Sequence, residues 1–220
     1  MDSDGEKGGL PEIRSPDDGR TPWVLNLGTR EIFSLGPYSD HESQRARTLL
    51  GSMVKEYKYD PIPPKRQLAI EKRVLAQAIN LMRQIWPDQP FDFCVPVPSN
   101  RRNGPSLATE FSAKLSSRYP RIKVGRSALL KNREISSLKS VPKKERSRHL
   151  KDAYTFAPTV TVSRGILIVD DIYDTGATLS EVNRAIENCA LGMFGELPRH
   201  FIVLSHLESN KRWKKWPGHS

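Results

Sequence analysis

The chain has 220 residues, of which 37% are hydrophobic, and a formal net charge of +10 at pH 7. This length suits one α/β domain with additions, and no apolar run is long enough to span a membrane. The two cysteines, Cys94 and Cys189, can build neither a disulfide framework nor a four-cysteine zinc site. The positive charge indicates an anionic partner, and it fits a nucleic acid as well as a small polyphosphate.

The N-terminal part of the chain begins with a polar tail. Residues 1–20 are acidic, Gly-rich and poor in apolar residues, which predicts a disordered segment and is the reverse of a signal peptide. We therefore expect a cytosolic protein. The β-like runs Trp23–Leu27 and Glu31–Leu35 predict a hairpin. Helical spacing predicts helices over 41–57 and 65–86. One apolar stripe of the second helix is expected in the core: Leu68, Leu75, Ile79, Met82 and Trp86.

The C-terminal part of the chain alternates between strand-like and helical segments, which is typical of a doubly wound parallel sheet. A segment dense in Lys, Arg and Ser, residues 131–151, interrupts this alternation. The apolar run Gly165–Val169 is the strongest strand candidate. The expected strands are 93–98, 122–124, 165–169 and 201–205, and the expected helices are 105–118 and 178–189.

The residues after Val169 carry the chemistry. Ligands of open α/β sheets bind beyond the carboxyl ends of the strands, where Asp170 and Asp171 are expected. Two adjacent carboxylates repel each other, and the vicinal hydroxyls of a ribose are matching donors for them. The small residues that follow open a helix, whose N-terminus favours a phosphate monoester. We therefore expect a ribose 5-phosphate group to be bound by residues 170–178.

Three other interpretations of this stretch are weaker. Asp174 or Thr175 could simply cap the next helix, but this leaves Asp170 and Asp171 unexplained. Asp174-Thr175-Gly176-Ala177 also matches retroviral-type aspartic proteases, in which the triplet lies between strands, whereas a helix follows it here. Receiver domains open with an apolar strand and paired acids, but at the chain start and without the threonine-rich loop.

The stretch from Ile166 to Thr178 resembles the phosphoribosyl pyrophosphate signature of type I phosphoribosyltransferases. That signature is an apolar strand, two acidic residues, two variable ones and then Asp/Thr-Thr-Gly-x-Thr. More of the chain, roughly residues 30–206, is similar to the competence protein ComF-like branch of this family. The matching pieces are Val95-Pro96-Val97-Pro98 with Arg101 and Arg102, Leu129–Arg133, Glu145-Arg146, Ala153-Tyr154, and the "lysine-tyrosine" residues Tyr38, Lys55, Tyr57, Lys58 and Tyr59.

Two features depart from that branch. Its N-terminal four-cysteine zinc module cannot form here. Its usual Arg-Gly-Phe-Asn after the first core strand is replaced by Arg102-Asn103-Gly104-Pro105.

The resemblance implies an α/β phosphoribosyltransferase fold. It divides the chain into a tail (1–20), an N-terminal hairpin and helices called the hood (21–90), a core (91–206) and a basic C-terminal tail (207–220). It further implies a transferase of nucleotide metabolism that binds phosphoribosyl pyrophosphate and passes the phosphoribosyl group to an unidentified acceptor. Mg²⁺ would be held through ligand and water near Asp170 and Asp171, with no direct protein ligands.

The resemblance also assigns roles to single residues. The ribose and its phosphate would be bound by Asp170, Asp171, Asp174, Thr175, Gly176, Ala177 and Thr178. The pyrophosphate would be bound by Ser99, Arg101 and Arg102. Segment 131–151 would close as a lid and bring Lys131 or Arg133 to the leaving group, so the expected catalytic residues are Asp170, Asp171, Lys131 and Arg133.

Other functional classes remain open at this point. The chain could sense a phosphoribosyl ligand without catalysis, or associate with nucleic acid. The run Lys211–Trp216 interleaves cations with aromatic residues, as single-strand binders do, and we expect it to be unstructured. His149 and His200 lack metal-ligand spacing. The acceptor and the oligomeric state cannot be read from the residues.

Overall fold

A computed structural model describes residues 23–27, 30–39, 47–99, 105–135, 138–193, 197–207 and 213–215. The described strands form a seven-stranded sheet in the order β4-β3-β7-β8-β2-β1-β9 and a small sheet of β5 and β6. The strands are β1 (Trp23–Leu27), β2 (Arg30–Ser34), β3 (Phe93–Pro96), β4 (Lys123–Val124), β5 (Leu129–Lys131), β6 (Tyr154–Phe156), β7 (Ile166–Tyr173), β8 (Arg199–His206) and β9 (Lys214–Lys215).

The large sheet is mostly parallel. The pairs β4–β3, β3–β7, β7–β8 and β8–β2 run parallel, while β1 pairs antiparallel with β2 on one side and with β9 on the other. The central strand β7 is apolar at every position from Ile166 to Val169, and all four residues are buried. Such a run suits a strand that is covered on both faces. The prediction of a mixed α/β fold with a mostly parallel sheet is confirmed.

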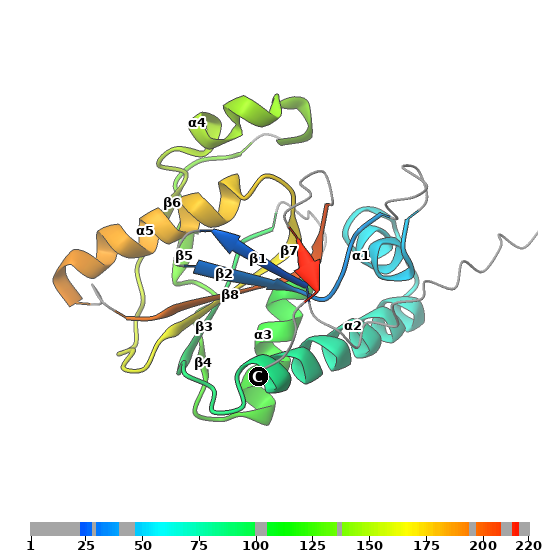
Figure 1. Cartoon of the computed structure of the whole chain (residues 1–220), viewed down its shortest axis with the longest axis horizontal. Coiled ribbons are helices and arrows are strands. Elements are labelled where there is room, and N and C mark those ends of the chain that lie inside the picture. The colour runs from blue at the N-terminus through cyan, green and yellow to red at the C-terminus, as the bar shows by residue number, and fades with distance from the viewer. Residues whose placement is uncertain are drawn as a thin grey trace, which may run out of the picture.

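Helices cover both faces of this sheet (Figure 1). On one face lie α1 (Leu49–Tyr59), α2 (Pro64–Ile85) and α3 (Leu107–Arg118). On the other face lie α5 (Ala177–Met193), the β5–β6 pair and the short α4 (Arg146–Leu150). Two short 3₁₀ turns, η1 (Leu138–Ser140) and η2 (Lys143–Glu145), precede α4.

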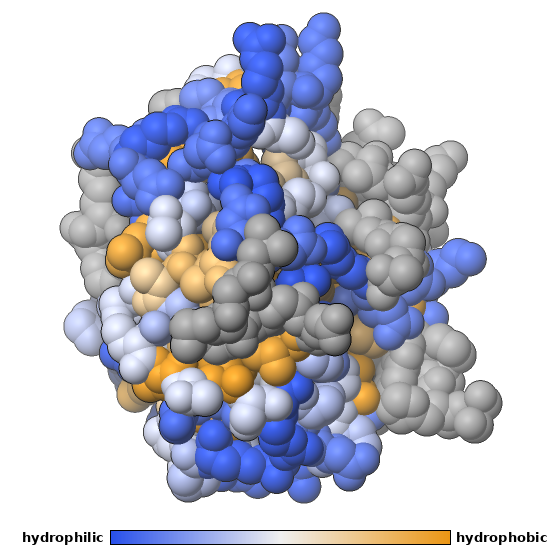
Figure 2. All heavy atoms as spheres, turned by 90° about the vertical axis from the view of Figure 1, so that its left-hand side faces the viewer, coloured by the Kyte–Doolittle hydropathy of each residue, from blue (hydrophilic) through white to orange (hydrophobic). Residues whose placement is uncertain are grey.

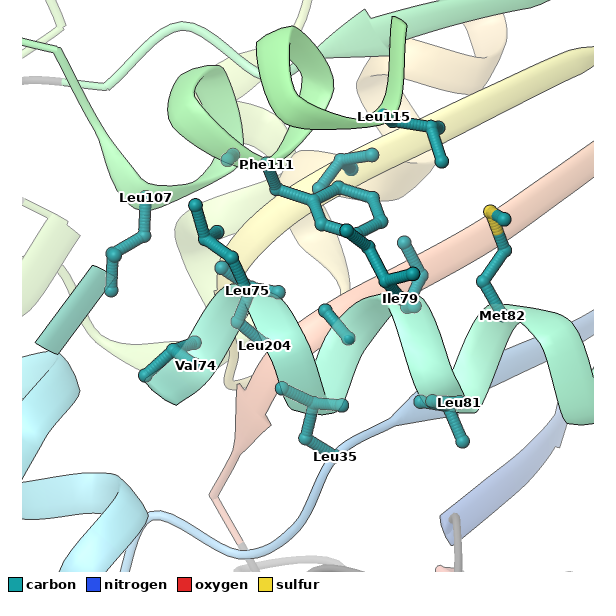
Figure 3. Packing of buried hydrophobic residues seen from close by; sticks show 14 of the residues in the cluster. Leu35, Val74, Leu75, Ile79, Leu81, Met82, Leu107, Phe111, Leu115 and Leu204 are labelled. Carbon is teal, nitrogen blue, oxygen red and sulfur yellow. The ribbon is translucent and has the colours of Figure 1, made fainter. Parts of the chain in front are cut away.

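The predicted apolar stripe of α2 packs largely against α3 in the core. Figure 3 shows Leu75, Ile79 and Met82 of α2 on the side that faces Phe111 and Leu115 of α3. All five side chains are buried. The predicted core role of the α2 stripe therefore holds for these three positions, and Trp86 packs partly buried against the same cluster. Leu68 is an exception, because it is 49% exposed near the start of the helix.

The second core lies on the α5 face. It joins buried residues of β7 and α5 to the β5–β6 pair, for example Ile168, Val182 and Phe156. On the left-hand side of Figure 1, the surface of the molecule carries a band of hydrophobic residues between hydrophilic ones (Figure 2).

The N-terminal elements belong to the same sheet as the core. The predicted hairpin of β1 and β2 is present, and β2 pairs in parallel with β8 through Phe33 and Ile202. Buried side chains of β2, α1 and α2, within the predicted hood of residues 21–90, pack into one cluster with α3, β7 and β8. The hairpin covers the edge of β8 that β7 leaves open.

Several boundaries differ from the predicted ones. The first helix starts at Leu49, because the Thr48 side chain accepts from Gly51 N–H at 2.9 Å and caps it there. The predicted start near residue 41 lies outside the described residues. The Arg47 backbone is bridged to Ser39 instead. The central strand β7 runs to Tyr173, so Asp170 and Asp171 lie within the strand. None of the helices that the structure describes is long and apolar enough to cross a membrane.

Candidate functional site

A cleft of about 2190 Å³ opens at the carboxyl ends of the parallel strands. Its walls come from segments that are far apart in sequence: the end of α1, the residues after β3, the segment after β5, and the end of β7 with the first turn of α5. Among the predicted site residues, the structure brings together Ser99, Lys131, Arg133, Asp170, Asp171, Asp174, Thr175, Gly176, Ala177 and Thr178. Arg101 and Arg102 lie outside the described residues.

Asp170 is the partly exposed carboxylate on the floor of this cleft. One of its oxygens accepts from the Asp171 backbone N–H at 2.8 Å. Burial raises the pKa of Asp170 to about 6; Lys58 counteracts this rise and Asp171 adds to it. The ionised carboxylate is thus incompletely compensated, and a bound hydroxyl donor would supply a missing partner.

Asp171 has a different environment, although it is the next residue. It is only 4% exposed. Its Oδ1 accepts from Ala108 N–H at 2.7 Å, in the first turn of α3, and its Oδ2 lies 3.7 Å from Lys58 Nζ. A carboxylate at a helix N-terminus is stabilised by the N–H groups there. Asp171 therefore positions α3 and Lys58, and its contact with a ribose stays a prediction.

The turn between β7 and α5 is built around Gly176. Gly176 has φ = +79°, and a Cβ on it would lie 2.5 Å from Tyr173 Oη. Gly176 O accepts the first hydrogen bond of α5 from Ser180 N–H at 2.8 Å. The N–H groups of the first turn point out of the helix end, where the macrodipole is positive. Glycine is thus required both by the backbone conformation and by the space beside Tyr173.

Asp174 forms ion pairs with the basic segment that contains η2 and α4. Lys143 Nζ lies 3.3 Å from Asp174 Oδ1, and Arg146 donates to Asp174 Oδ2. Arg146 Nε also donates to Val141 O at 3.1 Å. These ion pairs tie η2 and α4 to the turn between β7 and α5, so Asp174, which lines the cleft, also contacts the predicted lid.

The two basic residues predicted to be catalytic, Lys131 and Arg133, contact different segments of the chain. Lys131 donates to Ser99 O at 3.1 Å, which brings the end of β5 to the loop after β3. Burial, helped by the charge of Lys58, lowers the pKa of Lys131. Arg133 lines the cleft and donates to His149 O, so it also braces the end of α4.

Lys58 is a residue of this site that was not among the predicted site residues. It lies in the last turn of α1, lines the cleft and is 22% exposed in its side chain. The only sequence signal for it was the resemblance of the Lys58-Tyr59 pair to the family's "lysine-tyrosine" region. Its contact with Asp171 depends on how α1 packs over the end of β7, which no local pattern encodes.

A metal ion in this cleft would have to be held partly by a bound polyphosphate, in addition to protein side chains. Within the described residues, no group of three His, Cys, Asp or Glu side chains is placed to hold one. Asp171 has both oxygens engaged, by Ala108 N–H and by Lys58, whereas one oxygen of Asp170 accepts from Asp171 N–H. These residues fit a Mg²⁺ ion carried by a polyphosphate, with Asp170 contacting its water shell.

The aromatic C-terminal run is Lys211–Trp216, and its described part, residues 213–215, has a structural role. Trp213 is buried, stacks on His206 with ring centroids 4.2 Å apart and meets Tyr173 edge-on at 5.3 Å. Lys214 and Lys215 pair with β1. The expectation that this run is unstructured is wrong for 213–215, because Trp213 fills the end of the sheet. The rest of the run lies outside the described residues.

His149 and His200, which lack metal-ligand spacing in the sequence, are not among the residues that line the cleft. His149 contributes its backbone oxygen to Arg133. His200 packs against Trp86 and Phe91, and burial lowers its pKa to about 4.

A scan against protein-family models finds no match for this chain, and a search of the curated proteins finds none either.

Proposed function

We propose that this chain binds phosphoribosyl pyrophosphate in the cleft and is a transferase with the type I phosphoribosyltransferase fold. The observation that carries the proposal is the convergence of Asp170, the Thr175–Thr178 turn and Lys131 on one cleft at the carboxyl ends of parallel strands. A ribose 5-phosphate offers hydroxyl donors at one end and a dianion at the other. These match a carboxylate and a helix N-terminus, respectively.

In this proposal, the phosphoribosyl group passes from pyrophosphate to the acceptor. A bond forms between the acceptor and ribose C1 while the bond from C1 to pyrophosphate oxygen breaks, and the electron pair leaves with pyrophosphate. Asp170 holds the ribose hydroxyls, and the turn before α5 holds the 5-phosphate. Lys131 lies where it can meet the negative charge on the leaving group. Mg²⁺, when bound to the pyrophosphate, would neutralise part of that charge.

The basic segment that contains η2 and α4 excludes water in this proposal. It is attached to the phosphate turn through Asp174, so its ion pairs link the lid to the loop that binds the ligand. The sensor alternative uses the same binding residues and differs only in lacking turnover. The nucleic-acid alternative loses one of its aromatic residues, because Trp213 is buried.

Isothermal titration of phosphoribosyl pyrophosphate with Mg²⁺ tests the proposal. Wild type is expected to bind saturably, and Asp170→Asn is expected to weaken binding about tenfold or more, because a hydrogen bond to a charged group is lost. Asp88→Asn is the matched control, since Asp88 is exposed in the turn after α2, away from the cleft.

The outcomes separate the alternatives. Absence of saturable binding by the folded wild type would overturn the proposal as a whole. Binding that depends on Asp170, without pyrophosphate release in a screen of nitrogen-containing acceptors, would identify a sensor instead of a transferase.

A further inference from the structure

The outward face of α2 carries a stripe of positive charge. This helix has 22 residues and lies at the surface beside α1 and α3 (Figure 1). Four of its exposed basic residues, which we call the α2 stripe, are Lys65, Lys72, Arg73 and Arg83. At 3.6 residues per turn, Lys65, Lys72 and Arg83 lie within about 20° of one another around the helix axis. The buried Val74 lies on the opposite side, so the stripe points to solvent.

The acids nearest to α2 do not balance this stripe. Glu71, the one acidic residue of α2, accepts from the Tyr57 hydroxyl at 2.8 Å. Glu56 of α1 pairs with Arg66 at 2.8 Å. Among the described residues, no acidic side chain forms an ion pair with a member of the α2 stripe. Like charges on one helix face repel each other, and an anionic partner relieves this repulsion.

The neutral residues of the same face indicate the kind of anion. They are small or polar: Ala69, Ala76, Asn80 and Gln84. Leu68 is the one large apolar side chain of the described α2 that is exposed. A helix that lies on a membrane surface needs a broad apolar face, and a protein interface depends on aromatic anchors. Phosphate groups need only cations and polar donors, which is what this face offers.

Two further features favour a DNA duplex. The sequence of α2 contains no aromatic residue on which the bases of a single strand could stack. Lys72 and Arg83 lie about 16 Å apart along the helix axis, and the major groove of B-form DNA is about 12 Å wide. Their long side chains can therefore reach phosphates on the two sides of that groove. The major groove of duplex RNA is much narrower.

We propose that the α2 stripe binds the phosphate backbone of duplex DNA without reading its sequence. This surface is separate from the cleft, because none of its four residues lines the cleft. The inference thus goes beyond the proposed function and does not rest on it.

Fluorescence anisotropy of an end-labelled DNA duplex of mixed sequence, titrated with the full chain at several salt concentrations, tests the proposal. Wild type is expected to bind with an affinity that falls steeply as salt rises. Lys72→Gln/Arg83→Gln is expected to weaken binding about tenfold and to reduce the slope of log affinity against log salt by about two, because two phosphate contacts are lost. Both positions are exposed and glutamine is a good helix former, so the Tm should change little.

The matched control is Lys144→Gln/Lys151→Gln, which removes the same two charges from η2 and the end of α4, on the other face of the sheet (Figure 1). We expect its effect to be less than about twofold, because salt screens distant charges. Equal weakening in the two double variants would show that binding follows net charge. Unchanged binding by Lys72→Gln/Arg83→Gln would show that the DNA binds elsewhere. Either result overturns the proposal.

Three other ligands test the assignment to duplex DNA: a single strand of the same sequence, a duplex RNA, and vesicles of phosphatidylcholine with phosphatidylserine. Each is expected to bind more weakly and to depend less on Lys72 and Arg83. One that binds as tightly as duplex DNA, with the same dependence, would overturn the assignment. Phosphoribosyl pyrophosphate binding should be unchanged in Lys72→Gln/Arg83→Gln, so this inference and the proposed function can fail separately.

Discussion

At the residue scale, the paired acids show how neighbouring side chains of one strand acquire separate tasks. Asp171 is directed to the start of α3 and to Lys58, whereas Asp170 remains in contact with the cleft. The sequence predicted both carboxylates at the ligand. Only the packing of α1 and α3 against β7 reveals that Asp171 completes a helix terminus, because Ala108 lies far from it in sequence.

The raised pKa of Asp170 predicts how the stability of the protein depends on pH. Its pKa in the folded protein, about 6, lies above the value near 3.8 of an unfolded chain. The folded state therefore binds the proton more tightly, and the Asp170 carboxylate increasingly destabilises the fold as pH rises from about 4 through about 6. We expect Asp170→Asn to stabilise the ligand-free protein at pH 8, by on the order of 2 kcal/mol, and to have little effect at pH 4.

The measurement is urea denaturation of wild type and Asp170→Asn at both pH values. Asp88→Asn serves as the control again, and its effect should not change with pH in this way. An Asp170→Asn variant that is less stable than wild type at pH 8 would show that the carboxylate is fully compensated without a ligand.

At the scale of the element, the turn before α5 combines a conformational requirement with the proposed binding of the 5-phosphate. The sequence predicted a strand, a small-residue turn and a helix here, and the structure has all three. The strand ends later than predicted, since β7 pairs with β8 as far as Tyr173 and His206. Polar residues at a strand end look like a loop in the sequence, but a partner strand can extend the ladder through them.

Gly176→Ala is expected to destabilise the protein by about 1–2 kcal/mol, because an L-residue is strained at this φ. It should also weaken ribose 5-phosphate binding, since the added Cβ displaces Tyr173 and shifts the turn. Adding Tyr173→Phe removes the closest atom and should restore part of the stability, while the strain in φ remains. Denaturation and titration of the two variants measure these effects.

Gly36→Ala is the control for that series. A Cβ at Gly36 would meet only Leu50 Cδ2, at 3.4 Å, and its φ is not positive. Equal stability losses at the two glycines would contradict the special conformation of the turn.

At the scale of the whole molecule, residues from both ends of the described chain complete the same sheet. The hairpin β1–β2 joins β8, and β9 joins β1. Trp213 is placed against His206 and Tyr173 by this arrangement, at the end of the strand that carries Asp170. The C-terminal aromatic run thus stabilises the scaffold of the cleft.

Trp213→Ala is expected to cost about 3–5 kcal/mol, because a buried aromatic side chain is removed. For a protein of this size that corresponds to a fall in Tm of roughly 10 °C. Lys214→Ala, an exposed neighbour in β9, should change the Tm little. A Trp213→Ala variant with unchanged Tm but weaker binding to single-stranded DNA would favour the nucleic-acid alternative.

The sequence by itself determined the features that depend on local order. These are the apolar run of β7, the helical stripe of α2 and the small-residue turn at Gly176, because period, propensity and φ are properties of neighbouring residues. It could not place Lys58 beside Asp171, direct Asp171 to α3 or bury Trp213. Those contacts join segments separated by many residues, and the tertiary structure decided them through the packing of α1, α3 and β9 around one sheet.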